Sequence, residues 1–217
     1  SLDALIVVGD DQLEQYRFDN MPAVLIYCGS DIQNDVSPLP DSAPEYWRQA
    51  RSQFHESEGP RDYPVDHNLA RHLVRTLVES NFDIAFADRL GRDHGEGHAF
   101  GFVHQRLMTH STVPIVPIIL NTYYPPNQPA PRRCYGLGQA IRAAVESWDR
   151  DSRIGILASG GLSHFTIDED LDRTILDACR NKDGETLKSL PVAKLNSGNS
   201  EIRNWITVAG AVEHLDT

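Results

Sequence analysis

The chain has 217 residues and a formal net charge of −11. With 40% hydrophobic and 24% charged residues, its composition is typical of a soluble globular protein. The acidity argues against nucleic-acid binding, which usually needs a basic face, and no apolar run has the length of a membrane span. Its three cysteines, an odd number, suit a reducing compartment, so we expect a cytoplasmic protein.

The first half of the chain predicts strands around one long excursion. Apolar runs predict strands over residues 2–8 and 23–27. Residues 28–64 are rich in Gly, Ser, Asp and Pro and show little periodicity, which predicts a long loop. Residues 66–80 form the clearest helix, because their apolar positions share one face and the segment begins with a capping Asp66.

The second half of the chain continues the alternation of strands and helices. Such alternation predicts one α/β domain over the whole chain, with a mixed central sheet and helices on both faces. Further strands are expected over residues 83–87, 114–120 and 154–158, and further helices over 138–148, 168–180 and 200–212.

The segment SGGLSHF, at residues 159–165, is the strongest indication of a functional site. It follows the predicted strand 154–158, and open α/β sheets place their ligands at the carboxyl ends of strands. Its two adjacent glycines allow a sharp turn close to a ligand. His164 is therefore a candidate catalytic residue.

Other polar side chains follow predicted strands or open predicted helices. Asp10 and Asp11 follow the first strand, His94 and His98 lie in a glycine-rich segment, and Glu201 begins the last helix. Ordinary explanations exist for the acids, since Asp favours turns and Glu favours the first helical turn. Histidines and a carboxylate from separate strand ends suit a non-haem Fe(II) site, although their spacing alone does not establish one.

Several stretches of the sequence together resemble the class III extradiol ring-cleaving dioxygenases, the superfamily of the protocatechuate 4,5-dioxygenase β subunit. The combination of GGLSH with a later E-x-x-N-W is the most specific. The stretches are VVGDDQ at 7–12, GHAFGF at 97–102, PIVPIILNTYYPP at 114–126, RRCYGLGQAI at 132–141, IGILASGGLSHF at 154–165 and NSEIRNW at 199–205.

The resemblance implies an Fe(II) enzyme that uses dioxygen to open the ring of a small aromatic diol, such as a protocatechuate-like or gallate-like compound. It also implies assembly with further subunits, either copies of the chain or a partner subunit. In that family two histidines and one glutamate hold the iron. The glutamate of E-x-x-N-W falls on Glu201, and the histidine of GGLSH, an acid/base, falls on His164. A further active-site histidine matches His98, with His94 as the alternative.

The sequence departs from the family pattern at the two iron-binding histidines. We expect the first to lie in an N-terminal segment ahead of the given sequence, and the second stands in an Asn-Asp-His turn that here ends in Gln12. An amide oxygen is a poorer Fe(II) ligand than imidazole. Gln12 is the candidate metal ligand at this position, with Asp10, Asp11 and Glu14 left open as substitutes.

These departures motivate an alternative function, a non-catalytic or metal-poor homologue that acts as a partner subunit or binds a small molecule. The candidate substrate-binding residues are Arg132, Arg133 and Ser163. Either arginine could hold a substrate carboxylate, but a solvated pair beside a helix is an equally good interpretation.

Overall fold

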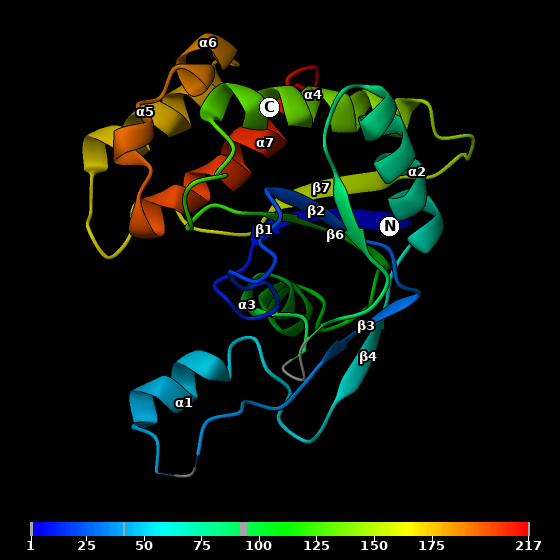
Figure 1. Cartoon of the computed structure of the whole chain (residues 1–217), viewed down its shortest axis with the longest axis vertical. Coiled ribbons are helices and arrows are strands. Elements are labelled where there is room, and N and C mark those ends of the chain that lie inside the picture. The colour runs from blue at the N-terminus through cyan, green and yellow to red at the C-terminus, as the bar shows by residue number, and fades with distance from the viewer. Residues whose placement is uncertain (1, 41, 92–94, 217) are drawn as a thin grey trace.

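Five strands form the central sheet in a computed structural model that describes residues 2–40, 42–91 and 95–216 (Figure 1). The strand order is β5-β2-β6-β1-β7. All neighbours are parallel except β2 and β6, which are antiparallel, so the sheet is mixed as predicted. The strands are β1 (Ala4–Asp10), β2 (Val24–Tyr27), β5 (Ala85–Ala87), β6 (Ile115–Leu120) and β7 (Ile154–Ala158).

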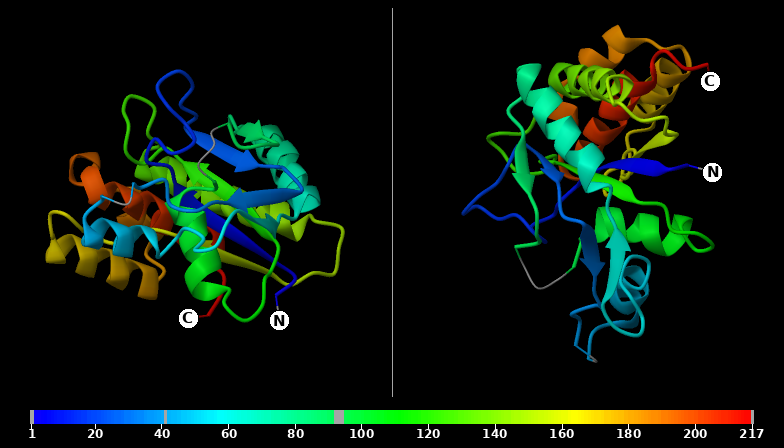
Figure 2. Two further views of the ribbon diagram at one scale, coloured as in Figure 1. Left: turned by 90° about the horizontal axis from the view of Figure 1, so that it is seen from below. Right: turned by 90° about the vertical axis from the view of Figure 1, so that its right-hand side faces the viewer.

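Helices cover one face of this sheet. They are α2 (His67–Glu79), α4 (Pro131–Glu146) and α7 (Ile202–Val212). Alternate β1 residues, Ile6 and Val8, join the core on this face together with apolar side chains of α2 and α4. Figure 2 shows these helices together on one side of the sheet.

The opposite face carries a smaller layer. It is built from α3 (His98–Phe102), a turn of π-helix (Val103–Leu107) and the hairpin of β3 (Asp31–Asn34) and β4 (Arg61–Pro64). Val7 of β1 points to this side and packs in a cluster with side chains of α3 and the hairpin. Both faces of the sheet are therefore covered, which confirms the predicted α/β class with helices on both faces.

A third cluster joins α4 and α7 to peripheral helices. These are α5 (Glu169–Arg180), α6 (Gly184–Lys188) and the 3₁₀ turns Val192–Lys194 and Ser197–Glu201, of which the second leads directly into α7. Within the described residues, the helices are all too short or too polar to span a bilayer.

Several predicted boundaries were wrong. The excursion 28–64 is not only loop, because it contains β3, β4 and the short helix α1 (Glu45–Arg51). The helix expected from residue 138 begins at Pro131, since proline is well suited to a first helical position. β1 extends to Asp10 instead of ending at residue 8, which brings this carboxylate to the last position of the strand.

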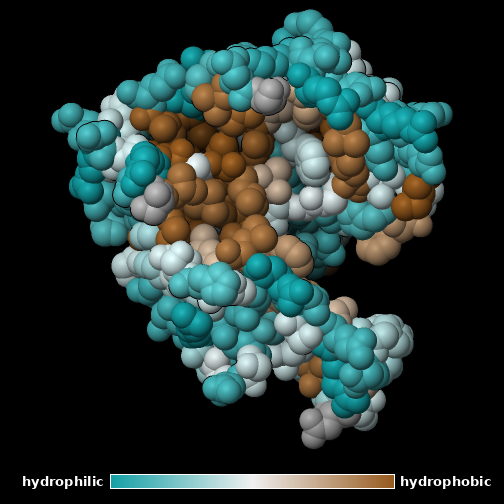
Figure 3. Space-filling model, turned by 180° about the vertical axis from the view of Figure 1, so that it is seen from behind, coloured by the Kyte–Doolittle hydropathy of each residue, from teal (hydrophilic) through white to brown (hydrophobic). Residues whose placement is uncertain are grey.

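The edge strand β7 leaves an apolar surface. All five of its residues are half-buried. An apolar cavity of about 190 Å³ beside it is lined in part by Ile154, Ile156 and Leu215. Figure 3 shows apolar residues gathered in a hollow on the side of the molecule where this edge lies.

Glycines allow α4 and α7 to pack at very short range. A Cβ at Gly138 would overlap the backbone of α7 at Thr207, and a Cβ at Gly210 would overlap the backbone of α4 at Tyr135. Because neither backbone can yield as a flexible side chain would, this contact fixes the position of α7 and of Glu201 at its start.

We predict that Gly138→Ala destabilises the protein by about 1–3 kcal/mol, the usual cost of overpacking. Gly136→Ala is the matched control in the same helix, where the new Cβ would lie 3.9 Å from Phe82 in ordinary contact. This control should stabilise the protein by about 0.5–1 kcal/mol through helix propensity. Urea unfolding of both variants measures the difference, and equal effects would contradict the packing constraint.

Candidate active site

A cavity of about 370 Å³ opens at the carboxyl ends of β1 and β7. This is the edge at which open α/β sheets bind ligands. Its walls combine two aromatic side chains, Phe54 and Phe102, with a group of polar ones. The polar side chains are Gln12, Ser159, His98, His164 and Glu201.

Glu201 is held rigidly in the wall of this cavity. It stands where the turn Ser197–Glu201 passes into α7, and it is only 5% exposed. The Tyr123 hydroxyl donates to Glu201 Oε1 at 2.9 Å, and the backbone N–H of Gly161 donates to Oε2 at 2.9 Å. The amide nitrogen of Gln12 lies 3.3 Å from Oε1. Both carboxylate oxygens are thus fixed by donors from three other segments of the chain.

The loop after β7 brings His164 to the same carboxylate. Gly160 has φ +144°, a conformation that favours glycine, and a Cβ there would lie 3.1 Å from Glu201. The Nδ1 atom of His164 lies 2.8 Å from the carbonyl oxygen of Leu162, to which it donates its proton. Nε2 therefore faces the cavity, 3.3 Å from Glu201 Oε1.

His98 enters the cavity from the opposite face of the sheet, at the start of α3. Its Nδ1 atom lies 2.7 Å from Glu14 Oε2, and its backbone N–H donates to Glu14 Oε1 at 3.0 Å. Burial acts to lower the pKa of His98, but the hydrogen bond and charge of Glu14 outweigh it and raise this pKa to about 9. Nε2 is left facing the cavity, 3.4 Å from Gln12 Nε2 and 3.9 Å from Asp10 Oδ2.

Asp10, the last residue of β1, is 1% exposed. Its Oδ1 atom accepts a hydrogen bond of 3.2 Å from Asn204 Nδ2 of α7, whereas Oδ2 has no hydrogen-bond partner within the described residues. Burial raises the pKa of Asp10 to about 7. A buried carboxylate oxygen without a partner is costly unless a cation or a donor meets it.

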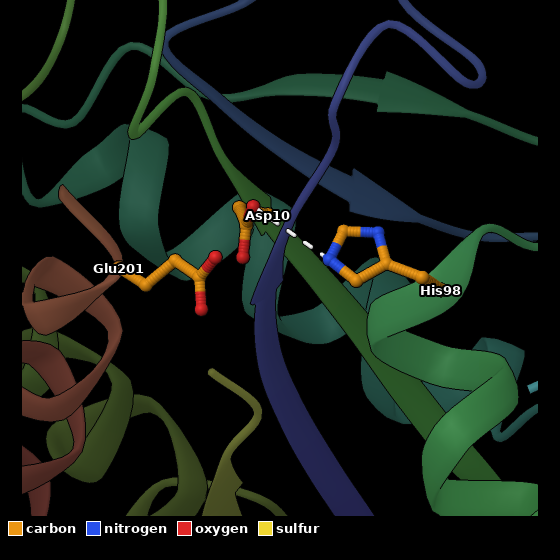
Figure 4. A group of neighbouring side chains, drawn as sticks. All are labelled: Asp10, His98 and Glu201. Atoms are coloured by element: carbon orange, nitrogen blue, oxygen red, sulfur yellow. Dashed lines mark ion pairs between the residues drawn. The ribbon is translucent and has the colours of Figure 1, made fainter. Parts of the chain in front are cut away.

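Asp10, His98 and Glu201 together form a candidate metal centre. Each offers one ligand atom, and these atoms lie within 4.8 Å of one another. Figure 4 shows the three side chains converging from three different elements. Neutral imidazole and carboxylate groups bind Fe(II) and related divalent ions, and such a cation would compensate the unpartnered Asp10 oxygen. The residues present therefore fit a divalent metal.

Comparison with known proteins agrees with this geometry. Residues 3–215 match the family described as the catalytic LigB subunit of aromatic ring-opening dioxygenase. The chain belongs to this family. The match confirms the resemblance to class III extradiol dioxygenases inferred from the motifs, and it covers almost the whole chain.

Individual relatives of the LigB family share about 30% identity with the chain. A gallate dioxygenase of Pseudomonas putida is 31% identical over 173 residues, 72% of this chain and 49% of its own length. A 2,3-dihydroxyphenylpropionate/2,3-dihydroxicinnamic acid 1,2-dioxygenase of Azotobacter vinelandii is 31% identical over 160 residues, 74% of this chain and 43% of its own length. The chain spans about half the length of these relatives.

Four of the candidate residues named from the sequence line one cavity. Gln12, His98, His164 and Glu201 all line it, although they come from four separate segments of the sequence. Their individual roles stay predictions. The alternative to His98, His94, lies outside the described residues.

The three candidate substrate-binding residues do not line this cavity. Arg133 stacks over the ring of Phe82 at 3.9 Å, and its neighbour Arg132 is exposed on the same helix. The Ser163 hydroxyl donates to Asp172 Oδ2 at 2.7 Å, so it anchors the loop after β7 to α5. Their substrate-binding role stays a prediction, without support from the cavity geometry.

Sequence reasoning missed Tyr123 and Asn204 as parts of the site. Tyr123 follows β6, so the rule that ligands gather at strand ends could have found it. Asn204 is the asparagine of E-x-x-N-W, and it bonds to Asp10 Oδ1 at 3.2 Å and to the Ser159 carbonyl oxygen at 2.9 Å. It thereby ties α7 to the ends of β1 and β7.

We predict that Gly160→Ala weakens Mn²⁺ binding, because the new Cβ would press on Glu201 at 3.1 Å. Gly59→Ala is the matched control, since Gly59 has nearly the same φ, +146°, but no atom within 4 Å of the added Cβ. Both variants should lose about 1 kcal/mol of stability through backbone strain. Calorimetric Mn²⁺ titration separates them, and unchanged affinity in Gly160→Ala would contradict the contact.

Proposed function

We propose that this chain forms the catalytic site of an Fe(II)-dependent extradiol dioxygenase that opens a catecholic ring with dioxygen. The observation that carries the proposal is the convergence of His164 with the Asp10, His98 and Glu201 cluster on one aromatic-walled cavity in a LigB-family chain. The relatives named above are dioxygenases of gallate and of 2,3-dihydroxyphenylpropionate. Both names describe hydroxylated aromatic acids, so we propose a substrate of that class.

His164 is the base of this proposed reaction. A catechol that binds through both oxygens must lose a proton, and imidazole is suited to accept it near neutral pH. Because Nδ1 donates to the Leu162 carbonyl oxygen, Nε2 is the ring nitrogen that is left to exchange a proton with a ligand in the cavity. The distance of 3.3 Å from Nε2 to Glu201 Oε1 puts this base beside the metal ligands.

The iron would be held by side chains of the cluster that contains Glu201 and His98. When bound, it supplies the redox chemistry that brings dioxygen and an electron-rich ring to reaction, which side chains lack. Phe54 and Phe102 supply flat apolar walls at the cavity, where an aromatic ring can displace water. Glu14 holds the imidazole of His98 in one orientation, with Nε2 toward the cavity.

The alternative function is a metal-poor homologue that keeps the fold as a partner subunit or binding domain. The observation that favours it is the amide of Gln12 in the cavity wall, where the family pattern has an iron-binding histidine. Metal analysis of protein purified without chelators separates the two functions, since stoichiometric iron contradicts the metal-poor alternative.

Assembly into a homo-oligomer, or with a partner subunit, is part of the proposed function. The apolar surface beside β7 supports it, because apolar patches of this kind are common at subunit interfaces. Sedimentation analysis measures the assembly, and a monomer at micromolar concentration would contradict the homo-oligomer.

Ring cleavage is tested by loading the protein with Fe(II) without oxygen. The loaded protein is then exposed to air with catechol, protocatechuate, gallate or 2,3-dihydroxyphenylpropionate. We expect a yellow ring-fission product with at least one of these compounds. Stoichiometric iron with no product from any of them would contradict the proposed activity.

Two variants test the roles of the site residues. We predict that His164→Ala slows turnover by roughly 10²-fold or more, the scale of general acid–base catalysis, and keeps its iron. Glu201→Ala should instead lose iron, because it removes a ligand. Iron content and kcat of both variants are the measurements, and loss of iron from His164→Ala would show that His164 is itself a ligand.

A further inference from the structure

We propose that Asp10 is the metal ligand at the turn where the family pattern has its second iron-binding histidine, and that Gln12 is a hydrogen-bond donor to Glu201 instead of a ligand. This inference rests on the proposed function, because it assigns ligands to the metal that ring cleavage needs. The sequence left four candidate metal ligands at and just after the end of β1, and their contacts distinguish them. They are Asp10, Asp11, Gln12 and Glu14.

Asp11 and Glu14 already have other partners. The oxygens of Asp11 accept the backbone N–H groups of Gln15 at 2.8 Å and Tyr16 at 3.1 Å, so they fix the turn after β1. The Glu14 carboxylate is paired with both the backbone and the ring of His98. Neither carboxylate belongs to the cluster of possible ligand atoms, which within the described residues consists of Asp10, His98 and Glu201.

Gln12 presents the wrong atom for a ligand. Its Nε2 atom lies 3.3 Å from Glu201 Oε1. Because an ionised carboxylate can only accept hydrogen bonds, the amide must turn its N–H group toward Glu201. An amide nitrogen that carries its protons has no lone pair for a metal, and the amide oxygen is directed away from Glu201. Gln12 is therefore placed to orient the carboxylate.

Asp10 differs from all three. Its Oδ2 atom is fully buried and has no hydrogen-bond partner within the described residues, and it points toward the Nε2 atom of His98 at 3.9 Å (Figure 4). Its other oxygen is fixed by Asn204 of α7 at 3.2 Å. One oxygen anchors the side chain while the other is aimed into the cluster, as expected of a monodentate metal ligand.

The substitution changes the chemistry of the site. A carboxylate in the place of an imidazole makes a ligand set harder, and oxygen ligands suit Mn²⁺ better than Zn²⁺. Two ionised carboxylates carry a formal charge of −2, which balances the charge of one divalent cation. We therefore expect Asp10→His to strengthen Zn²⁺ binding relative to Mn²⁺.

Mn²⁺ binding measured by electron paramagnetic resonance tests the assignment without any need for activity. In Asp10→Asn, which keeps the side-chain shape, we expect Mn²⁺ affinity to fall at least 10-fold, the scale of losses around metal sites. Asp11→Asn is the matched control, since it removes the same charge one residue away, and its affinity should stay within about 3-fold. Gln12→Ala should also bind Mn²⁺ within about 3-fold of the parent protein.

Two outcomes would overturn the assignment. Asp10→Asn could bind Mn²⁺ as tightly as the parent protein, or Gln12→Ala could lose Mn²⁺ while Asp10→Asn keeps it. Circular dichroism checks that each variant is folded. If Asp10→Asn is unstable, loss of Mn²⁺ binding in Gln12→Ala would still contradict the assignment. Metal binding that depends on Asp10 but gives no ring-fission product with iron would contradict the proposed function alone. If iron binding and ring fission both persist in Asp10→Asn, only the ligand assignment is contradicted.

Discussion

The site depends on one electrostatic constraint, the burial of several carboxylates at a single edge of the sheet. Asp10 and Glu201 are 1% and 5% exposed, and Glu14 lies beside them against His98. Like charges in a dry environment repel one another and lose hydration. Burial accordingly raises the pKa of Asp10 to about 7, while Glu14 keeps the pKa of His98 high, at about 9. Such an arrangement is costly unless a cation balances it.

The fold explains how these groups reach one place. β1 and β7 are parallel neighbours, so Asp10 and the His164 loop emerge at the same edge. α3 approaches from one face and α7 from the other, which brings His98 and Glu201 to opposite sides of this edge. The close approach of α4 and α7 at Gly138 and Gly210 fixes the position of α7 relative to α4. The position of Glu201 is therefore fixed by packing far from the cavity.

The sequence predicted the parts of the site that reside in local patterns. The strand end before SGGLSHF singled out His164 from local residue types. Glu201 was singled out only by the family's E-x-x-N-W motif, because a glutamate in a first helical turn is ordinary. The pairing of His98 with Glu14 was not predictable, since 84 residues separate them and the contact depends on how α3 crosses the sheet. α3 itself escaped prediction because it is only five residues long and lies in glycine-rich sequence.

The choice between Asp10 and Gln12 shows why residue types alone were insufficient. Asp10 ends β1 and Gln12 lies two residues beyond it. Only the contacts show that Gln12 turns its amide nitrogen toward Glu201, whereas Asp10 turns Oδ2 toward His98. The same limit explains Arg133, whose charge suggested a substrate carboxylate but whose guanidinium stacks on Phe82. In each case the side chain had several possible partners, and the one that it contacts is a residue distant in sequence.

A carboxylate ligand at Asp10, as proposed, would also change what the reaction requires of His164. A carboxylate ligand lowers the charge of the site by one unit relative to a neutral imidazole. A less positive site acidifies a bound hydroxyl less strongly, so a catechol in this cavity would keep its proton to higher pH. Removal of that proton would then depend more on the proposed base His164, whose Nε2 atom lies 3.3 Å from Glu201. Because the Leu162 carbonyl oxygen accepts from Nδ1, Nε2 is the nitrogen of His164 that is left toward the cavity for this proposed role.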